Sequence, residues 1–448
     1  MINRTKLLAD LKLQVLDLEA DLRQRFATNI DYKTRLTSDW QAARDAGRTS
    51  EDVSIWAEGQ FTQSAVAWVL ACVFVRFCED NQLLDTPLLV GTDSRGQSAV
   101  ARQESFYLQN PTASDNDYLR DVFGVATRLP GLSDVMRVQR TLLQAPVSAD
   151  LGKQLVRFFR ATNADTGVLM HDFADPDWNT RFLGDLYQDL SKAARERYAL
   201  LQTPEFIESF ILDRTLTSAL DIYALEDVDL IDPTCGSGHF LLGAFERLAP
   251  RWLRQMPGNV NVAIQETLNR ISGVDLNPYA VVIARFRLLI AAMRECRIHR
   301  LADAPAFTFH LACGDSLMHG YRASMSGVTG NLLEPQSTAD HYTRVEDREK
   351  LIAYLRHGQY HAVVANPPYI TVKDAQQNAN IRSRYSSCHM KYALSVPFME
   401  RIFELAIEGT QANQQRSGFT GQITSNSFMK REFGKKLIET HIRRWDMT

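Results

Sequence analysis

The chain has 448 residues, of which 45% are hydrophobic and 23% are charged, enough for roughly two or three domains with buried cores. Its formal net charge is −3, which excludes a protein that binds nucleic acid through an overall basic surface and leaves only local basic patches. The six cysteines form no C-x-x-C pair and have no histidine at zinc spacing, so we expect reduced thiols, no disulfides and no metal site.

The first third of the chain predicts an all-α domain. Apolar residues recur at steps of three and four between Leu8 and Leu22, which gives one apolar stripe on a helix of about 25 residues. Three heptads are too few for a long coiled coil. We therefore expect the stripe to pack against a second helix, Trp56 to Asp80.

The second helix contains the most apolar stretch of the chain, Ala65 to Phe77. This stretch includes an arginine and is too short to cross a bilayer, so it predicts a core helix and no membrane attachment. The segment from Met1 to Phe26 intersperses acids and bases and has no signal-peptide pattern. We expect a cytoplasmic protein.

Turn residues predict a loop and a domain boundary. The stretch from Asp85 to Asp117 has weak apolar patterning and contains Thr86-Pro87 and Asn110-Pro111, which favours loop. The segment from Asp172 to Asn179 includes Pro176 and predicts the boundary. We therefore expect a helical domain at residues 1–175 and a second domain at residues 176–448.

A strand, a glycine turn and a helix are predicted in succession after Val228. The apolar run Val228 to Ile231 leads into Asp232-Pro233-Thr234-Cys235-Gly236-Ser237-Gly238, and helix formers follow. Gly236 and Gly238 allow positive φ and close approach of a ligand to the helix N-terminus. The turn lacks the third glycine of a dinucleotide fingerprint and begins with an acid, which favours a cationic sulfonium and amino-acid ligand over a pyrophosphate.

Two further strands are predicted to end at acids. Ile271 to Val274 leads to Asp275, and Phe307 to Ala312 leads to Asp315. Asp275 is well placed to accept hydrogen bonds from both hydroxyls of a ribose, and Asp315 from the amine of the same cofactor's adenine. For each aspartate, a helix N-cap is the alternative role.

A fourth strand, His361 to Ala365, ends at Asn366-Pro367-Pro368-Tyr369. The two prolines fix two φ angles and supply no N–H, so the Asn366 amide and the carbonyls beside it form a rigid hydrogen-bonding edge. An exocyclic amine could donate to the Asn366 side-chain oxygen and the Pro367 carbonyl while its base lies against Tyr369. This predicts N-methylation. The alternative is a turn in which Tyr369 is an ordinary packing residue.

The four motifs together predict an α/β fold, a doubly wound and mostly parallel sheet of the Rossmann-like kind, preceded by the helical domain. Ligands in open α/β sheets bind outside the carboxyl ends of the strands, so all four motifs are expected along one edge. A fifth strand, Ser417 to Thr424, and a helix, Arg431 to Arg444, are predicted to follow.

Two C-terminal segments carry an excess of positive charge. The segment Thr371 to Lys391 contains four basic residues, which are Lys373, Arg382, Arg384 and Lys391. The second basic segment is Ser427 to Thr448. Both predict contact with nucleic-acid phosphates. A solvated loop and a solvated helix face are the alternatives.

In this order, the motifs TPEF (Thr203 to Phe206), DPTCGSG, GVDLNP, GDSL and NPPY resemble those of the S-adenosylmethionine-dependent DNA adenine-N6 methyltransferases. The resemblance covers about residues 180–448. The N-terminal stretch and the segment Gly184 to Phe206 are similar to the methyltransferases of type 2 BREX, or phage growth limitation, defence systems.

The resemblance implies a role for each motif. Thr203, Pro204 and Phe206 would border the methionine end of the cofactor. Asp232, Pro233, Gly236 and Gly238 would form its main loop, with the ribose at Asp275 and the adenine at Asp315. Asn366 and Pro367 would hold the target amine, Pro368 would stiffen the loop, and Tyr369 would stack on a flipped base.

The resemblance also implies double-stranded DNA as substrate and other proteins of a phage-defence or restriction-modification system as further partners. The family pattern continues with more strands and a target-recognition region, so we expect the chain to be an N-terminal portion or to be completed by a partner. Methylation of a protein glutamine, an RNA base or cytosine N4, and an inactive cofactor-binding scaffold, remain alternatives. The sequence does not predict an oligomeric state.

Overall fold

A computed structural model describes residues 4–45, 49–91, 94–129, 131–132, 135, 143–190, 203–320, 348–409 and 416–446. The chain forms two compact units. The first comprises Met1–Ser38, Val53–Arg197 and Leu289–Phe307, and the second Asp39–Asp52, Tyr198–Leu288 and Thr308–Thr448. The sequence-based division into residues 1–175 and 176–448 remains a prediction.

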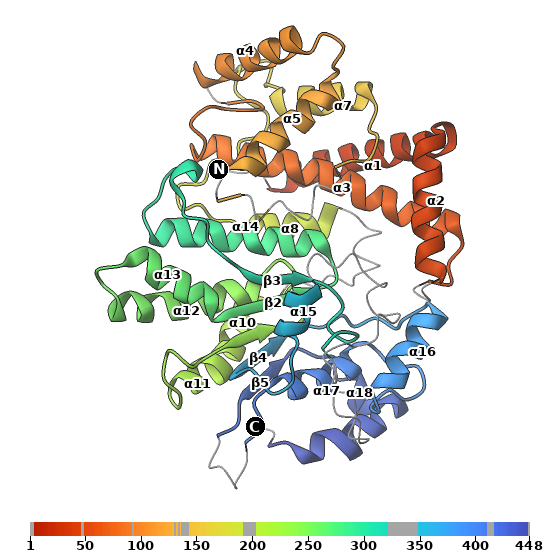
Figure 1. The fold of residues 1–448 in the computed structure, drawn as a ribbon, viewed down its shortest axis with the longest axis vertical. Coiled ribbons are helices and arrows are strands. Elements are labelled where there is room, and N and C mark those ends of the chain that lie inside the picture. Colours follow the sequence, from red (N-terminus) through yellow and green to blue (C-terminus); the bar gives the residue numbers. More distant parts are fainter. Residues whose placement is uncertain are drawn as a thin grey trace. The chain divides into compact units, whose positions relative to one another are not determined.

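The first unit is helical throughout its regular elements (Figure 1). Its helices are α1 (Arg4–Thr28), the start of α2 (Ile30–Asp45), α3 (Val53–Asp80), α4 (Ser94–Gln109), α5 (Asp115–Arg128), α7 (Ala149–Arg160) and α8 (Arg181–Leu190), with the end of α14 (Pro278–Glu295). Helix α1 packs along α3 through its apolar stripe, in which Leu11, Leu18 and Leu22 are fully buried. This confirms the expected pairing of these two helices.

Helix α3 is the core helix of the first unit. Among the described residues it alone is long and apolar enough to cross a membrane by length and composition, but 94% of its apolar window is buried inside the protein. Trp68 and Phe77 on it are fully buried. The burial agrees with the core helix that the sequence predicted.

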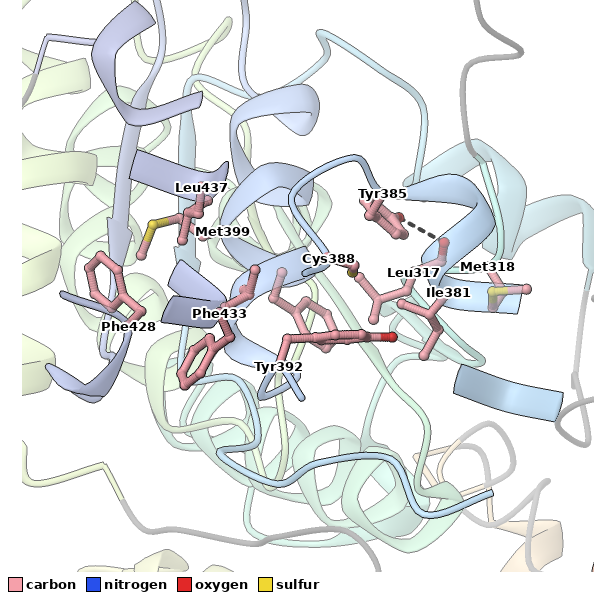
Figure 2. Close-up of a cluster of buried hydrophobic side chains, with 12 residues drawn as sticks. Leu317, Met318, Ile381, Tyr385, Cys388, Tyr392, Met399, Phe428, Phe433 and Leu437 are labelled. Carbon is pink, nitrogen blue, oxygen red and sulfur yellow. Dashed lines mark hydrogen bonds between the residues drawn. The ribbon is translucent and has the colours of Figure 1, made fainter. Parts of the chain in front are cut away.

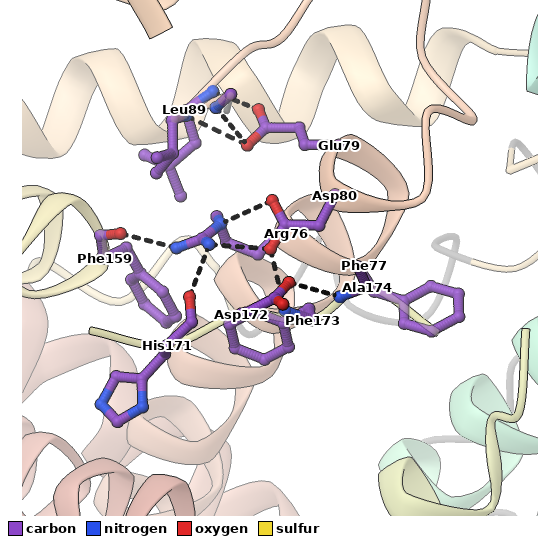
Figure 3. A network of polar contacts seen from close by, with 12 residues as sticks. Arg76, Phe77, Glu79, Asp80, Leu89, Phe159, His171, Asp172, Phe173 and Ala174 are labelled. Atoms are coloured by element: carbon purple, nitrogen blue, oxygen red, sulfur yellow. Dashed lines mark hydrogen bonds and ion pairs between the residues drawn. The ribbon is translucent and has the colours of Figure 1, made fainter. Parts of the chain in front are cut away.

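A buried polar network ties later segments of the first unit to α3 (Figure 3). Arg76 has no exposed surface and pairs with Asp80 at 2.8 Å. Its guanidinium also donates to the carbonyls of Phe159, at 2.6 Å, and His171, at 2.8 Å. Glu79 accepts hydrogen bonds from the backbone N–H groups of residues 88–91.

The loop expected between Asp85 and Asp117 is a wrong prediction, because it contains α4 and the start of α5. Helix α4 is held largely by polar side chains: Gln103 donates to Asp115 at 2.8 Å, and Arg102 pairs with Asp121. A helix held in this way has no continuous apolar stripe, so the sequence gives no helical period there.

The second unit contains a five-stranded parallel sheet with the order β3-β2-β1-β4-β5. The strands are β1 (Leu230–Asp232), β2 (Ile271–Asp275), β3 (His310–Cys313), β4 (Ala362–Ala365) and β5 (Phe419–Gln422). This confirms the predicted α/β fold. The strand order reverses between β1 and β4, the position at which doubly wound sheets bind ligands.

Helices cover both faces of the sheet. One face contacts α10 (Glu205–Leu212), α12 (His239–Gln255) and α13 (Val260–Asn269), and the other contacts α15 (Arg348–Tyr354) and α17 (Ser395–Leu405). The layer between the sheet and the α15 and α17 face includes Ile231, Val274 and Val363, all fully buried. A sheet buried on both faces explains why its strands appear in sequence as continuous apolar runs.

The helix predicted from Arg431 to Arg444 is confirmed as a helical segment, although it is not a regular α-helix. After the short α18 (Ser427–Lys430), the chain is helical from Glu432 to Arg444, with 3-10 geometry at Glu432–Gly434, π geometry at Leu437–His441 and 3-10 geometry at Ile442–Arg444. Gly434 lies so close to the carbonyl of Phe428 that a Cβ would fall 1.9 Å from the oxygen. Phe428, Phe433 and Leu437 pack into an apolar cluster (Figure 2) that also includes Tyr385, Tyr392 and Met399.

Candidate active site

The four motifs lie at the tips of neighbouring strands. Asp232 and Asp275 are the last residues of β1 and β2, Asp315 follows β3 by two residues, and Asn366 directly follows β4. All the strands are parallel, so these tips share one edge of the sheet. The order places β1 between β2 and β4, so the glycine turn is next to the Asn-Pro-Pro-Tyr loop.

The glycine turn requires both of its glycines. Gly236 has φ +52° and Gly238, the N-cap of α12, has φ +83°. A Cβ on Gly238 would lie 3.0 Å from the Cβ of Ala284 on α14, whereas a Cβ on Gly236 would meet no atom closer than 4.0 Å. The turn is therefore closed toward α14 and open at Gly236, as a cradle for a ligand must be.

Asp275 is fixed by two backbone hydrogen bonds. Its Oδ2 accepts from Gly236 N–H at 2.9 Å and its Oδ1 from Asn277 N–H at 2.8 Å. Each oxygen keeps a further lone pair that could accept from a hydroxyl. Burial raises the pKa of Asp275 to about 6, although the two backbone hydrogen bonds act to lower it.

Asp232 is almost fully buried, with 2% of its surface exposed. Its Oδ1 accepts from the N–H of Thr234 at 2.9 Å and from the Thr234 hydroxyl at 3.1 Å. Burial raises the pKa of Asp232 to about 8, because its effect is larger than that of the two hydrogen bonds, which lower the pKa. The negative charge of the nearby Asp275 raises it further. The carboxyl is therefore largely protonated at neutral pH.

The loop after β3 is tied to the glycine turn through Ser316, which the sequence analysis did not single out. The Ser316 hydroxyl donates to the carbonyl of Pro233 at 2.6 Å. Asp315 caps its own turn, since its Oδ1 accepts from the N–H groups of Leu317, at 2.9 Å, and Met318, at 3.2 Å. The described residues after Asp315 form a turn rather than a helix, so Asp315 is not a helix N-cap, and its contact with an adenine stays a prediction.

The structure brings the TPEF segment and the Asn-Pro-Pro-Tyr loop together. The Asn366 side-chain N–H donates to the Thr203 hydroxyl at 3.1 Å, and the Tyr369 hydroxyl donates to Asn366 Oδ1 at 2.9 Å. These bonds hold the Asn366 amide with its oxygen toward Tyr369. Burial raises the pKa of Tyr369 to about 12, so its hydroxyl stays a donor. Asn366 Oδ1 keeps a second lone pair that could accept from another donor.

Exposure to solvent changes sharply between Thr203 and Phe206. Thr203 is 5% exposed, whereas Phe206 in the first turn of α10 is 74% exposed. Pro204 is the N-cap of α10, and Pro367 is buried while Pro368 is partly exposed. Phe206 therefore offers a ring that packs into no core, beside the buried Thr203.

The four basic residues predicted to contact nucleic acid differ in their surroundings. Lys373 and Lys391 are exposed. Arg382 donates to the carbonyl of Met390 at 2.6 Å and lies 5.2 Å from the centre of the Tyr392 ring. Arg384 is partly buried and donates to the carbonyl of Met318. Both arginines thus hold the loop around α16 (Ala375–Arg384) in place, and contact with DNA stays a prediction for all four.

Within the described ranges, no group of three or more His, Cys, Asp or Glu residues could hold a metal ion. The free cysteines among them include Cys235 and Cys313 at the strand tips, and burial raises the pKa of the Cys235 thiol well above its usual value.

Comparison with known proteins gives consistent matches. Residues 269–444 match the family of Eco57I restriction-modification methylases. The chain is 46% identical, over 98% of its length, to the adenine-specific methyltransferase PglX of Streptomyces coelicolor. It is 27% identical, over 54% of its length, to the type II methyltransferase M.BstVI of Geobacillus stearothermophilus. A DrdV–DNA complex matches 95% of the chain with 14% identity and a TM-score of 0.49.

These relatives are longer than the chain. It spans 37% of the length of the Streptomyces coelicolor protein and 36% of the Geobacillus stearothermophilus protein.

Proposed function

We propose that this chain is an adenine-specific DNA methyltransferase that transfers a methyl group from S-adenosylmethionine to the N6 amine of an adenine. Its 46% identity to the adenine-specific methyltransferase PglX of Streptomyces coelicolor supports this proposal. The observation that carries the proposal is the meeting of Asn366 with Thr203 at the sheet edge that also holds the glycine turn. The amide that would receive the amine thus adjoins the residues that would hold the methyl donor. The proposed setting is a cytoplasmic phage-defence or restriction-modification system.

The residues present fit the proposed cofactor. The open space at Gly236 would let a ligand lie against the backbone. The two oxygens of Asp275, each held by a backbone N–H, could accept hydrogen bonds from ribose hydroxyls. Asp232 lies at the same turn, where an amino-acid ammonium group would favour its ionised form. When bound, the cofactor supplies an electrophilic methyl group on its sulfonium sulfur. Thr203, Pro204 and the exposed Phe206 would border that end, and Asp315 the adenine.

The target amine needs positioning more than a strong base. Asn366 Oδ1 and the Pro367 carbonyl would accept its two N–H groups, which turns the nitrogen lone pair out of conjugation with the ring. The same two oxygens would stabilise the positive charge that develops on the nitrogen before it loses a proton. The prolines keep both oxygens in place, so little reorganisation is needed during the reaction.

The adenine would have to leave the DNA stack to reach Asn366. Extruding a base costs a few kcal/mol. Stacking on the ring of Tyr369 would return about 1 to 3 kcal/mol of that cost. Lys373 and Lys391, which are exposed near this loop, would contact phosphates of the same DNA. The proposed partner is therefore double-stranded DNA, with other defence-system proteins as further partners.

The test is transfer of tritium from labelled S-adenosylmethionine to DNA by the purified protein and by Asn366→Ala. We expect the substitution to reduce transfer at least about 100-fold, because it removes an oxygen that acts on the reacting nitrogen. Cofactor binding, measured by calorimetry, should stay unchanged. Transfer that survives Asn366→Ala would remove the catalytic assignment.

The matched control is Asn259→Ala, the same chemical change at an exposed residue before α13, and it should leave transfer unaltered. Offering DNA without adenine, RNA and protein beside ordinary DNA identifies the acceptor. Tight cofactor binding with no transfer to any acceptor would instead indicate an inactive scaffold.

A further inference from the structure

A buried arginine lies behind the glycine turn. Arg287 is on α14 and is 4% exposed. Its Nη1 donates to the carbonyl of Ser237 at 2.6 Å. Ser237 stands between the two glycines of the turn and is itself 3% exposed. A charged donor buried under a main-chain carbonyl forms a stronger hydrogen bond than a neutral donor does.

The peptide group between Ser237 and Gly238 is fixed at both ends. Its carbonyl accepts from Arg287, and its N–H donates to the carbonyl of Cys235 at 2.8 Å. On the α14 side, Ala284 packs closely against Gly238, and a Cβ on Gly238 would lie 3.0 Å from the Ala284 Cβ. A peptide plane held by two hydrogen bonds and a packing contact cannot rotate without breaking at least one of them.

This restraint matters because of the glycines on either side. Glycine has the largest backbone freedom of any residue, so ordering a glycine costs more conformational entropy than ordering another residue. If the glycine turn is already ordered before the ligand binds, this entropy loss does not reduce the binding affinity.

We propose that Arg287 is a positioning residue that sets the shape of the glycine turn in advance of cofactor binding. As far as it concerns the cofactor, this inference rests on the function proposed above. Arg287 acts through the Ser237 carbonyl, so its loss should weaken cofactor binding by loosening the turn.

The same helix offers a matched control. Arg285, two residues earlier on α14, is 2% exposed and donates from its Nη2 to a main-chain carbonyl at 2.6 Å. Its acceptor is Leu311 in the middle of β3 rather than the glycine turn. Arg285→Lys and Arg287→Lys therefore make the same change, at similar burial, to a bond of the same length.

The experiment compares these two variants with the unaltered protein by amide hydrogen exchange and by calorimetric titration with S-adenosylhomocysteine. Without ligand, Arg287→Lys should speed exchange at residues 234–239 at least tenfold, whereas Arg285→Lys should not. The dissociation constant for S-adenosylhomocysteine should rise at least tenfold in Arg287→Lys and by less than threefold in Arg285→Lys. Equal effects of the two variants, or none from Arg287→Lys, would overturn the proposal.

The exchange measurement separates this inference from the proposed function. If the protein binds the ligand but transfers no methyl group, the proposed function fails and the prediction for the turn is still decided. If Arg287→Lys does not fold, the unaltered protein decides the question, because the proposal requires slow exchange of the Gly238 amide without ligand. Exchange of that amide as fast as in an unstructured peptide would refute it.

Discussion

At the scale of single residues, two carboxyl groups at the strand tips are buried where their charge is unfavourable. Asp232 and Asp275 have pKa values of about 8 and about 6, raised mainly by burial. Perturbed carboxyl groups of this kind gather at functional sites, since a stabilised core would bury an apolar side chain instead. The protein therefore gives up stability at neutral pH to keep acids beside the glycine turn.

Asp232→Asn should raise the melting temperature in a pH-dependent way. The pKa of Asp232 in the folded protein, about 8, lies above its ordinary value of 3.8, so its contribution to stability is present below pH 3.8 and is lost as the pH rises to 8. Asparagine can keep the hydrogen bonds from Thr234 and does not ionise. The gain of the variant should be small at pH 5 and largest at pH 8 and above, measured by calorimetry.

Asp227→Asn, at an exposed position, is the control and should show no such trend. A gain for Asp232→Asn that is the same at every pH would contradict the predicted ionisation.

The residue types at the strand tips could be predicted from sequence because each directly follows an apolar run. The hydrogen bonds between these residues could not be predicted from sequence. Asn366 and Thr203 are 163 positions apart, and Gly236 and Asp275 are 39 apart, so only the fold brings them together. The hydrogen bond from Arg287 to the Ser237 carbonyl likewise cannot be predicted from the neighbouring sequence, because an arginine in a helix is usually exposed.

At the scale of elements, the spacing of apolar residues along the chain determined which helices and strands could be predicted. The five strands lie within a few residues of where they were expected, and β1, β2 and β4 follow mainly apolar runs. Helix α4 was missed because polar side chains hold it. The helical segment after β5 was predicted, but its change from 3-10 to π geometry was not.

The packing of α7 against α5 gives a test at this scale. A Cβ on Gly152 of α7 would lie 2.4 Å from the backbone nitrogen of Asn116 on α5, whereas a Cβ on Gly124 of α5 would meet only Arg128, at 3.8 Å. Gly152→Ala should force the helices apart and destabilise the protein by about 1 to 3 kcal/mol. Gly124→Ala should stabilise it by about 0.5 to 1 kcal/mol through helix propensity.

Urea unfolding followed by circular dichroism measures both changes. The same sign for the two alanine variants would refute the packing of α7 on α5.

At the scale of the whole molecule, each unit has its own interior, and that of the helical unit is organised around a charge. Arg76 pairs with Asp80 and binds two carbonyls from segments far along the chain. A buried ion pair adds little net stability, but removing one partner leaves an unpaired charge. The network thus fixes which segments lie on α3 rather than adding to the apolar interior.

Arg76→Met should destabilise the helical unit by about 3 to 5 kcal/mol, because it leaves Asp80 and the carbonyls without their donor. Unfolding in urea can be followed through Trp68, which is fully buried on the same helix. Arg23→Met removes the exposed pair with Glu58 and should cost less than about 1 kcal/mol. Similar losses in the two variants would contradict the special role of the buried pair.

The order of the strands has an evolutionary consequence. The turn and the acids proposed to hold the donor come from β1, β2 and β3, while the loop proposed to hold the acceptor follows β4, across the point where the order reverses. The two halves are nevertheless coupled, because Arg401 on α17 donates to the carbonyls of Ser316 and His319 in the loop after β3, each at 3.0 Å. Evolutionary change beyond β4 therefore has to preserve the contacts that keep this loop in place.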